Sequence, residues 1–517
     1  MGVDAAEEVI STTQNLDAAL RHLRYREEQR TVWIDALCIN QDSTNEKNQQ
    51  VAIMGKIYAQ AICVLVWLGH ADDSSDKAIR LLQVIGEQVE VKSWSRYIIR
   101  PSATCTEHHW GDESKMLPFK NGEISNVLEL FQRPYFSRLW IKQELAFAKK
   151  AVFYCGTKTI SLESFSNAVA CLRIKNMMET ALLDPPGVWY MNILNVYDLC
   201  KISPGNIDIS DLLFINKNAQ CRDPRDKIFA TSTLLSWEDR LLGVQPDYTQ
   251  DVETIYTEVA RRFYSNRRNL NLFRSCVLSH KSLELPSWVP DWSTFTLPGE
   301  IASLWSACGF ISPQLSFPDS ETLSVTGIAF SQVEEVVISM DIDLCDTADG
   351  EPSYFKYSRT VELVRKIKPT IDQLTSRQMN EYQRAEFLCK NLLAHIAEEN
   401  VPACEVFYKA EVHASAFQEI WRSHGDLTIL AQSLSLLQQD ALYHLENEWT
   451  GYDFFICANG SVGKANSGVK QGDMVTVVLG NIEPVILRQS STGNNNKPAT
   501  WKIVSVANVT DLMRGWR

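Results

Sequence analysis

The sequence lacks the features that mark secreted, membrane-spanning and disulfide-stapled proteins. Its 13 cysteines are odd in number and irregularly spaced, and they include no CxxC pair. Such usage predicts reduced thiols rather than a disulfide framework. The acidic start, residues 1–8, has no apolar signal segment, and the most apolar run, residues 61–69, is too short to cross a bilayer. We therefore expect a cytoplasmic protein without a membrane span.

Positive charge is also in short supply. The chain has 50 Lys and Arg against 63 Asp and Glu, a formal net charge of −13. This balance argues against a general nucleic-acid binder and predicts no nucleic-acid partner. One basic stretch between residues 261 and 274 has arginines interleaved with Phe263 and Tyr264. A nucleic-acid patch and a solvated helix end both fit it, and the helix end is the commoner structure.

Several enzyme motifs are missing. No GxSxG elbow, no GxGxxG after a predicted strand and no HExxH occurs, which removes the commonest hydrolase, dinucleotide and zinc-protease classes. Cys105, His108 and His109 are close in sequence, but a structural zinc site needs a second half that is not evident. Residues 460–464 do not complete a phosphate-binding loop, so their glycines are expected to turn a hairpin. We predict no metal site and no resident cofactor.

The 517 residues, 45% of them apolar, suggest about three domains. Residues 1–160 alternate strand and helix patterns and predict an α/β domain. Residues 161–450 are mainly helical in pattern, beginning with a helix predicted over 162–174, and include an extended crossing rich in Trp and Pro near 285–293. From 451 to 517, short alternating runs with Gly and Asn turns predict a small antiparallel barrel or sheet.

The N-terminal region predicts a parallel arrangement. Residues 31–39 are apolar on both faces, which is typical of a strand buried on both sides of a parallel sheet. An amphipathic helix and a second buried strand at 63–68 follow, so a right-handed strand–helix–strand unit is expected. A further strand is predicted at 151–155. Because the chain opens with a helix, we expect a first strand upstream of Met1.

A carboxylate falls on an apolar face of the helix predicted over residues 137–150. On a helical wheel at about 100° per residue, three basic residues share the side expected to face water: Arg138, Lys142 and Lys149. Glu144 lies on the opposite side beside Trp140 and Phe147. A carboxylate there is costly unless it is paired, protonated or lining a cavity. Glu144 is therefore either an acid in a ligand cleft or a buried glutamate bonded to backbone or arginine.

A second candidate site follows the predicted strand 31–39. Ligand crevices of open α/β sheets lie beyond the carboxyl ends of strands, which places Asn40 and Gln41 well for contacts. Asp35 is either part of the site or a helix-capping or arginine-pairing residue. Cys38 has no base near it in the sequence, so we expect a buried structural thiol.

These residues resemble the fungal heterokaryon incompatibility (HET) domain. The resemblance rests on motifs in the family's order along most of the chain: Trp33–Gln41, Gln50–Tyr58, Val66–Gly69, Arg133–Glu144, Cys155–Gly156, Asp223–Phe229, Pro246–Tyr248, Leu285–Ser293 and Gly472–Arg488. It implies a role in non-self recognition after cell fusion, leading to programmed cell death. Nothing before Asn15 matches the strand with which such domains usually begin, so the expected missing strand is this one.

The family is thought to be distantly similar to TIR domains, some of which cleave NAD with a glutamate. Residues 137–145, Ser-Arg-Leu-Trp-Ile-Lys-Gln-Glu-Leu, resemble the TIR segment that carries this glutamate. The resemblance implies a TIR-like, mainly parallel α/β domain, with Glu144 catalytic and NAD as substrate. It adds Asp35, Asn40, Gln41 and Trp140 as substrate-binding residues. The alternatives are a non-catalytic scaffold that binds a partner or self-associates through the HET domain, and a degenerate, truncated relative.

Overall fold

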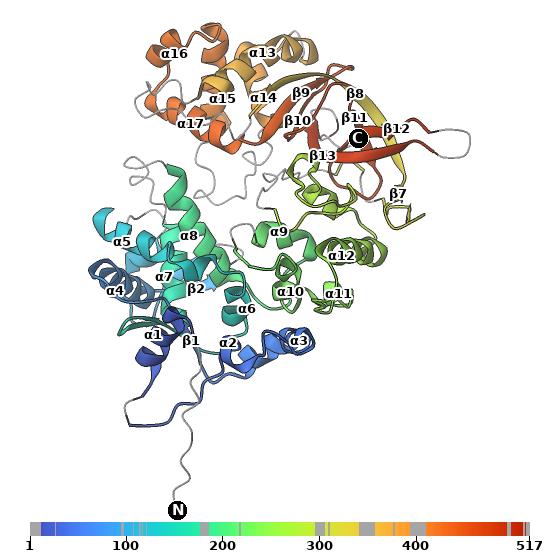
Figure 1. Ribbon diagram of the computed structural model, residues 1–517. Coiled ribbons are helices and arrows are strands. Elements are labelled where there is room, and N and C mark those ends of the chain that lie inside the picture. The colour runs from blue at the N-terminus through green and yellow to red at the C-terminus, as the bar shows by residue number, and fades with distance from the viewer. Residues whose placement is uncertain are drawn as a thin grey trace, which may run out of the picture. The chain divides into compact units, whose positions relative to one another are not determined.

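A computed structural model gives the structure of the chain (Figure 1). It describes residues 12–25, 27–94, 98–106, 108–112, 115, 117–119, 121–175, 186–216, 219–294, 306–308, 311–340, 357–375, 378–392, 410–493, 498–509 and 512. The acidic start and part of the predicted helical stretch, residues 393–409, lie outside this set. Two compact units divide the chain at Thr249 and Gln250.

The first unit mixes helices with short strands. Its strands are β1 (Val64–Trp67), β2 (Val89–Ser93), β3 (Ile98–Pro101), β4 (Ala151–Cys155) and β5 (Lys158–Ser161). Its α-helices are α1 (Gln14–Leu23), α2 (Asp35–Cys38), α3 (Thr44–Gln60), α4 (Asp73–Gln88), α5 (Asn121–Phe131), α6 (Ile141–Ala146), α7 (Leu162–Ile174), α8 (Pro186–Lys201), α9 (Leu212–Ile215), α10 (Asp226–Ser232) and α11 (Trp237–Arg240). Short 3₁₀ helices cover His108–Gly111, Pro134–Ser137 and Ile209–Asp211.

A three-stranded sheet of order β1-β4-β5 lies at the centre of this unit. β1 pairs with β4 in parallel, from Val64 opposite Ala151 to Trp67 opposite Tyr154, whereas β4 and β5 form an antiparallel hairpin. The sheet is therefore mixed rather than mainly parallel. Because β1 and β4 are parallel, their carboxyl ends meet at one edge of the sheet.

Helices α4, α5 and α7 pack together beside this sheet (Figure 1). The Phe153 ring of β4 stacks on the Phe165 ring of α7, with 4.3 Å between ring centroids, and both side chains are buried. Gly86 of α4 is the point of closest approach to α7, because a Cβ there would lie 2.0 Å from the Ser164 carbonyl oxygen. A reciprocal capping box between Asp72 and Ser75 starts α4. The predicted helix at 162–174 and the predicted strand at 151–155 are confirmed.

The predicted strand at residues 31–39 is wrong. Residues 31–34 are extended without a strand partner, residues 35–38 form the one-turn helix α2, and Val32 and Leu37 are exposed. Asp35, Ala36 and Leu37 favour a helix start, and apolar periodicity alone does not separate a short buried strand from a helical turn. The strand–helix–strand unit expected over residues 31–68 is consequently not formed, and the parallel partner of β1 is β4.

The second unit contains a closed antiparallel barrel of order β10-β13-β12-β11-β8-β9. Its strands are β8 (Gly327–Ser339), β9 (Tyr452–Cys457), β10 (Val462–Asn466), β11 (Met474–Val478), β12 (Val485–Ser491) and β13 (Thr500–Val509). The predicted antiparallel β module is confirmed as a barrel. Its β8 strand was not expected, because more than a hundred residues separate it from its neighbour β9 in the sequence.

Helices fill the sequence between β8 and β9 and precede the barrel. They are α12 (Val252–Arg267), α13 (Ser358–Leu374), α14 (Glu381–Leu392), α15 (Ala410–Arg422), α16 (Leu427–Ser433) and α17 (Leu436–Glu448), with 3₁₀ turns at Asn271–Ser275 and Leu278–His280 and a small hairpin of β6 (Leu315–Ser316) and β7 (Ser324–Val325). Gly460, at φ +86°, turns the β9–β10 hairpin as expected. In the described ranges, every helix is too short or too polar to cross a lipid bilayer.

Candidate functional site

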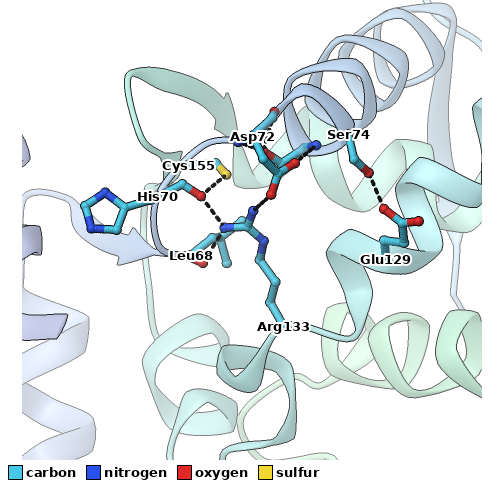
Figure 2. A network of polar contacts seen from close by, with 8 residues as sticks. Leu68, His70, Asp72, Ser74, Glu129, Arg133 and Cys155 are labelled. Carbon is cyan, nitrogen blue, oxygen red and sulfur yellow. Dashed lines mark hydrogen bonds and ion pairs between the residues drawn. The ribbon is translucent and has the colours of Figure 1, made fainter.

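The loop after β1 is held by one arginine, as Figure 2 shows. Arg133 Nη1 donates hydrogen bonds of 2.8 Å to the carbonyl oxygens of Leu68 and His70. Its Nη2 lies 3.0 Å from Oδ2 of Asp72, the residue that caps α4. A planar guanidinium suits this task because it presents several donors in fixed directions. Arg133 thereby fixes the carboxyl end of β1 against the start of α4.

The neighbouring strand end joins the same loop. The Gly156 N–H, just after β4, donates a 2.9 Å bond to the Gly69 carbonyl oxygen. Gly69 has φ +104°, in the region that favours glycine, and a Cβ there would also lie 3.3 Å from Nη1 of Arg133. Motifs at 66–69, 133–144 and 155–156, far apart in sequence, are thus joined by direct hydrogen bonds.

Glu144 lies on α6, a short helix that begins at Ile141, four residues after the 3₁₀ turn Pro134–Ser137 ends. Its side chain is 14% exposed. The Tyr135 hydroxyl donates a 3.3 Å hydrogen bond to Oε2, and the Arg138 guanidinium lies 4.0 Å from Oε1. Burial raises the pKa of Glu144, Arg138 lowers it, Asp35 raises it, and the bond from Tyr135 lowers it. The net direction is upward, because desolvation outweighs the long contacts with Arg138 and Tyr135.

Two further side chains share the electrostatic environment of Glu144. Burial raises the pKa of Tyr58, on α3, and the negative charges of Glu144 and Asp35 raise it further. The Trp33 ring meets the Tyr58 ring edge-on, with 6.0 Å between centroids. Asp35 is half-buried at the start of α2, and its carboxylate accepts a 2.8 Å bond from the Ala36 N–H. The structure therefore groups the predicted residues Asp35 and Glu144 around tyrosines that the sequence did not assign to the site.

Asn40 and Gln41 belong to the turn between α2 and α3. The Asn40 side-chain oxygen accepts a bond from the Asp42 N–H, and the backbone N–H of Asn40 donates to Oε1 of Glu46 at 3.0 Å. Gln41 Nε2 donates to the Asp35 carbonyl oxygen at 3.3 Å. Both side chains are exposed. Gln41 is therefore bonded to Asp35, whose charge raises the pKa of Glu144. The hydrogen bonds of Asn40 instead order the start of α3.

Trp140 connects α6 to a later part of the chain. Its indole Nε1 donates a 3.3 Å bond to Oδ2 of Asp226, in the 223–229 motif. Asp226 Oδ1 in turn accepts a 2.5 Å bond from the hydroxyl of Tyr248, in the 246–248 motif. Burial raises the pKa of Asp226, the bond from Tyr248 lowers it, and the nearby charge of Asp223 raises it. The charged motif at 223–226 thus contacts the α6 helix directly.

Two expectations about side-chain exposure are wrong. Lys142, expected to face water, is buried, because α6 is only six residues long and packs against α3, α8 and α10. A wheel drawn over a fourteen-residue helix therefore does not describe it. Cys38, expected to be buried, is exposed on the one-turn helix α2. Every cysteine among the described residues is a free thiol, and no metal-holding group of His, Cys, Asp and Glu occurs in that part of the chain.

The residues that sequence reasoning missed are Tyr58, Tyr135, Asp226 and Tyr248. Tyr58 looked like one more apolar position of a helix face, because a tyrosine fills such a position as well as leucine does. Tyr135 stands nine residues before Glu144, so nothing local shows that its hydroxyl meets the carboxylate. The pairing of Asp226 with Trp140 spans 86 residues and depends on how α10 packs against α6.

Comparison with known proteins agrees with these motifs. Residues 2–144 match the sequence profile of the heterokaryon incompatibility protein (HET) family. This stretch is therefore similar to a HET domain. The match ends at Glu144, so the matched stretch includes β1, Arg133 with its loop partners, and the candidate acid. β4, β5, α10 and Tyr248 lie beyond it.

Similarity to a curated protein extends past the HET domain. The chain is 27% identical over 402 residues to "Heterokaryon incompatibility protein 6, OR allele" of Neurospora crassa. The alignment covers 65% of this chain and 57% of that protein, so the chain spans only part of the relative's length. No solved structure matches the chain significantly.

Proposed function

We propose that this chain takes part in fungal heterokaryon incompatibility, the response to fusion of genetically different cells, as a cytoplasmic effector of programmed cell death. The HET domain at 2–144 and the similarity to the Neurospora crassa protein support this role. The chain's likeness extends over 402 residues, so the parts beyond the HET domain are included in the proposal. A protein partner or a second copy is expected to trigger it through the HET domain.

We further propose that the HET domain is a TIR-like NAD glycohydrolase with Glu144 as its catalytic carboxylate. The observation that carries this proposal is the setting of Glu144, which is 14% exposed, bonded to Tyr135 and only distantly paired with Arg138. A carboxylate in such a low-dielectric environment stabilises a developing cation far more than a solvated one does. Both contacts, at 3.3 and 4.0 Å, are longer than an ordinary hydrogen bond to a carboxylate.

The reaction breaks the bond between the ribose C1′ and the nicotinamide nitrogen. The bonding electrons leave with nicotinamide, and positive charge develops on the ribose as in other glycoside hydrolyses. The ionised Glu144 carboxylate stabilises this charge or holds the ribose hydroxyls. Water then adds to C1′ and loses a proton, which gives ADP-ribose, nicotinamide and one proton.

The other proposed binding residues belong to two segments, residues 35–41 and the start of α6. Asp35 influences Glu144 electrostatically, and Gln41 is bonded to the Asp35 carbonyl oxygen. Asn40 lies in the same turn and Trp140 lies one helical turn before Glu144. We propose that these side chains contact the substrate. NAD is consumed in this scheme, so no resident cofactor is required.

Nicotinamide release from NAD tests the proposal. The full chain is compared with Glu144→Gln, which keeps the shape of the side chain, and with Glu163→Gln, which removes an exposed carboxylate at the start of α7. We expect release by the wild type and by Glu163→Gln, and a loss of about 100-fold or more in Glu144→Gln. Release that survives in Glu144→Gln would remove this residue from its catalytic role.

A non-catalytic scaffold is the second candidate. Large apolar side chains that lie near Asp35 in the sequence are exposed. Their exposed fractions are 51% for Tyr25, 38% for Val32 and 37% for Leu37. Such side chains favour binding of another protein surface. Toxicity in fungal cells without nicotinamide release by any assembly of the chain would support the scaffold and exclude the glycohydrolase.

A further inference from the structure

Helix α6, which carries Glu144, is bonded to the start of α10 and to its C-cap Thr233 through Trp140 and Gln143, two residues that precede Glu144 in the sequence. Trp140 Nε1 donates to Asp226 Oδ2 at 3.3 Å, and Gln143 Nε2 donates to Thr233 Oγ1 at 2.8 Å. Gln143 is fully buried. A helix of six residues has little stability of its own, so these tertiary bonds decide where its side chains lie.

Asp226 extends this attachment to a third element. Its Oδ1 accepts the Tyr248 hydroxyl, and the Tyr248 N–H donates a 2.9 Å bond to Oδ1 of Asn48 on α3. The Lys47 ammonium lies 3.6 Å from the centroid of the Tyr248 ring. Helix α3 also carries Tyr58, which shares the environment of Glu144. The buried carboxylate of Asp226 therefore connects α6, which carries Glu144, through Tyr248 to α3, which carries Tyr58.

Arg225, the cationic side chain directly before Asp226 in the sequence, is bonded to other partners. Arg225 is bidentate to Asp223 at 2.8 and 2.9 Å, and Arg225 Nη1 also donates to the Tyr248 carbonyl oxygen at 2.9 Å. Arg225 is thus engaged with Asp223 and the backbone. Asp226 is 6% exposed and receives neutral donors, an indole and a phenol. Removing a buried acceptor leaves those donors unsatisfied, which is costly.

We propose that Asp226 and Tyr248 are positioning residues for the Glu144 site, so that the working HET site includes residues well beyond 144. The effect on catalysis rests on the proposed glycohydrolase function, whereas the effect on α6 does not. Neither residue is expected to touch substrate. They act through Trp140 on one side and through α3 on the other.

Hydrogen exchange and kinetics together test this inference. Asp226→Leu removes the acceptor, Asp226→Asn keeps an acceptor oxygen, and Asp73→Leu is the control at an exposed site on α4. We expect backbone amides of residues 143–147 to exchange about tenfold faster or more in Asp226→Leu. Asp226→Asn should restore most of the protection, and Asp73→Leu should leave it unchanged. In an active protein, Asp226→Leu should lower kcat and should also raise KM, because Trp140 is a proposed substrate contact that Asp226 holds in place.

Two variants keep the test decisive if Asp226→Leu does not fold. Tyr248→Phe and Trp140→Phe each remove one donor and leave an aromatic ring, and both should speed exchange in α6 more than in α4 and α7. Unchanged exchange in α6, or an equal rise in α4 and α7, would overturn the proposal. A wild type that releases no nicotinamide would refute the glycohydrolase function and leave the exchange result to decide on positioning.

Discussion

The Tyr135 hydroxyl donates a 3.3 Å hydrogen bond to the carboxylate of Glu144, nine residues further along the chain. Tyr135 is itself buried, and burial together with the charge of Glu144 raises its pKa, so its proton stays in place as a donor. This bond favours the ionised carboxylate, whereas burial favours the protonated one. The balance sets the pH at which Glu144 can stabilise a cation.

The pH profile of NAD cleavage should reflect this balance. In the proposed glycohydrolase the ionised form of Glu144 is the active one. Because the pKa of Glu144 is raised above the ordinary 4.5, the proposed activity should fall on acidification at a higher pH than it would with an ordinary glutamate. Tyr135→Phe removes the donor that lowers the pKa of Glu144, so the acidic limb of the profile should move to higher pH. Initial rates measured between pH 4 and 9 check this. A shift to lower pH would contradict the assigned hydrogen bond.

Arg133 should be important for the stability of the loop that follows β1. Arg133→Met keeps the length of the side chain and removes its bonds to Leu68, His70 and Asp72. We expect the free energy of unfolding to fall by about 1 to 2 kcal/mol, because the part-buried bond to the Leu68 carbonyl oxygen is lost, whereas the bonds to His70 and Asp72 are exposed to solvent and contribute less. Urea denaturation measures the change. Arg21→Met, which breaks an exposed ion pair with Asp17, should leave the midpoint unchanged.

The contact between α4 and α7 predicts opposite effects for two glycine substitutions. Gly86→Ala places a Cβ 2.0 Å from the Ser164 carbonyl oxygen, so the helices must separate and stability should fall by about 3 kcal/mol. Gly122→Ala, on α5, meets nothing within 4 Å and should stabilise by up to about 1 kcal/mol through helix propensity. Thermal unfolding of both variants checks the pair. If the two substitutions changed the stability equally, the close approach of Gly86 to the Ser164 carbonyl oxygen would be contradicted.

Asp239 should make the protein less stable as the pH rises. Its side chain is buried and accepts a 2.7 Å bond from the Ile209 N–H, and burial raises its pKa to about 6 from 3.8. The group binds its proton more tightly when folded, so its contribution is complete below pH 3.8 and is lost as the pH rises through about 6.

The variant Asp239→Asn isolates this contribution. The amide cannot ionise, so the variant should gain stability relative to the wild type between pH 4 and 7.5, by about 2 to 3 kcal/mol. Denaturation midpoints at the two pH values give the difference. A difference between variant and wild type that is the same at both pH values would exclude titration of Asp239 in this range.

The sequence alone determined the elements with strong local signals. Helix α7 occupies the predicted residues 162–174, β4 the predicted 151–155, and the alternating tail closes into a barrel. These elements have sharp boundaries, such as the Ser161 cap of α7 and the glycine turn at 460. The sequence also identified Glu144 as a candidate site residue, because a charged side chain on an apolar helix face can be recognised without knowledge of its partners.

Only the tertiary structure decided what surrounds that carboxylate. Residues 31–39 have a pattern that fits a buried strand, yet they form an extended segment and a helical turn, because β4 rather than this segment pairs with β1. Lys142 is buried because other helices pack around the short α6. Trp140 meets Asp226 across 86 residues. Such contacts depend on packing between distant segments, and local periodicity and propensity carry no information about them.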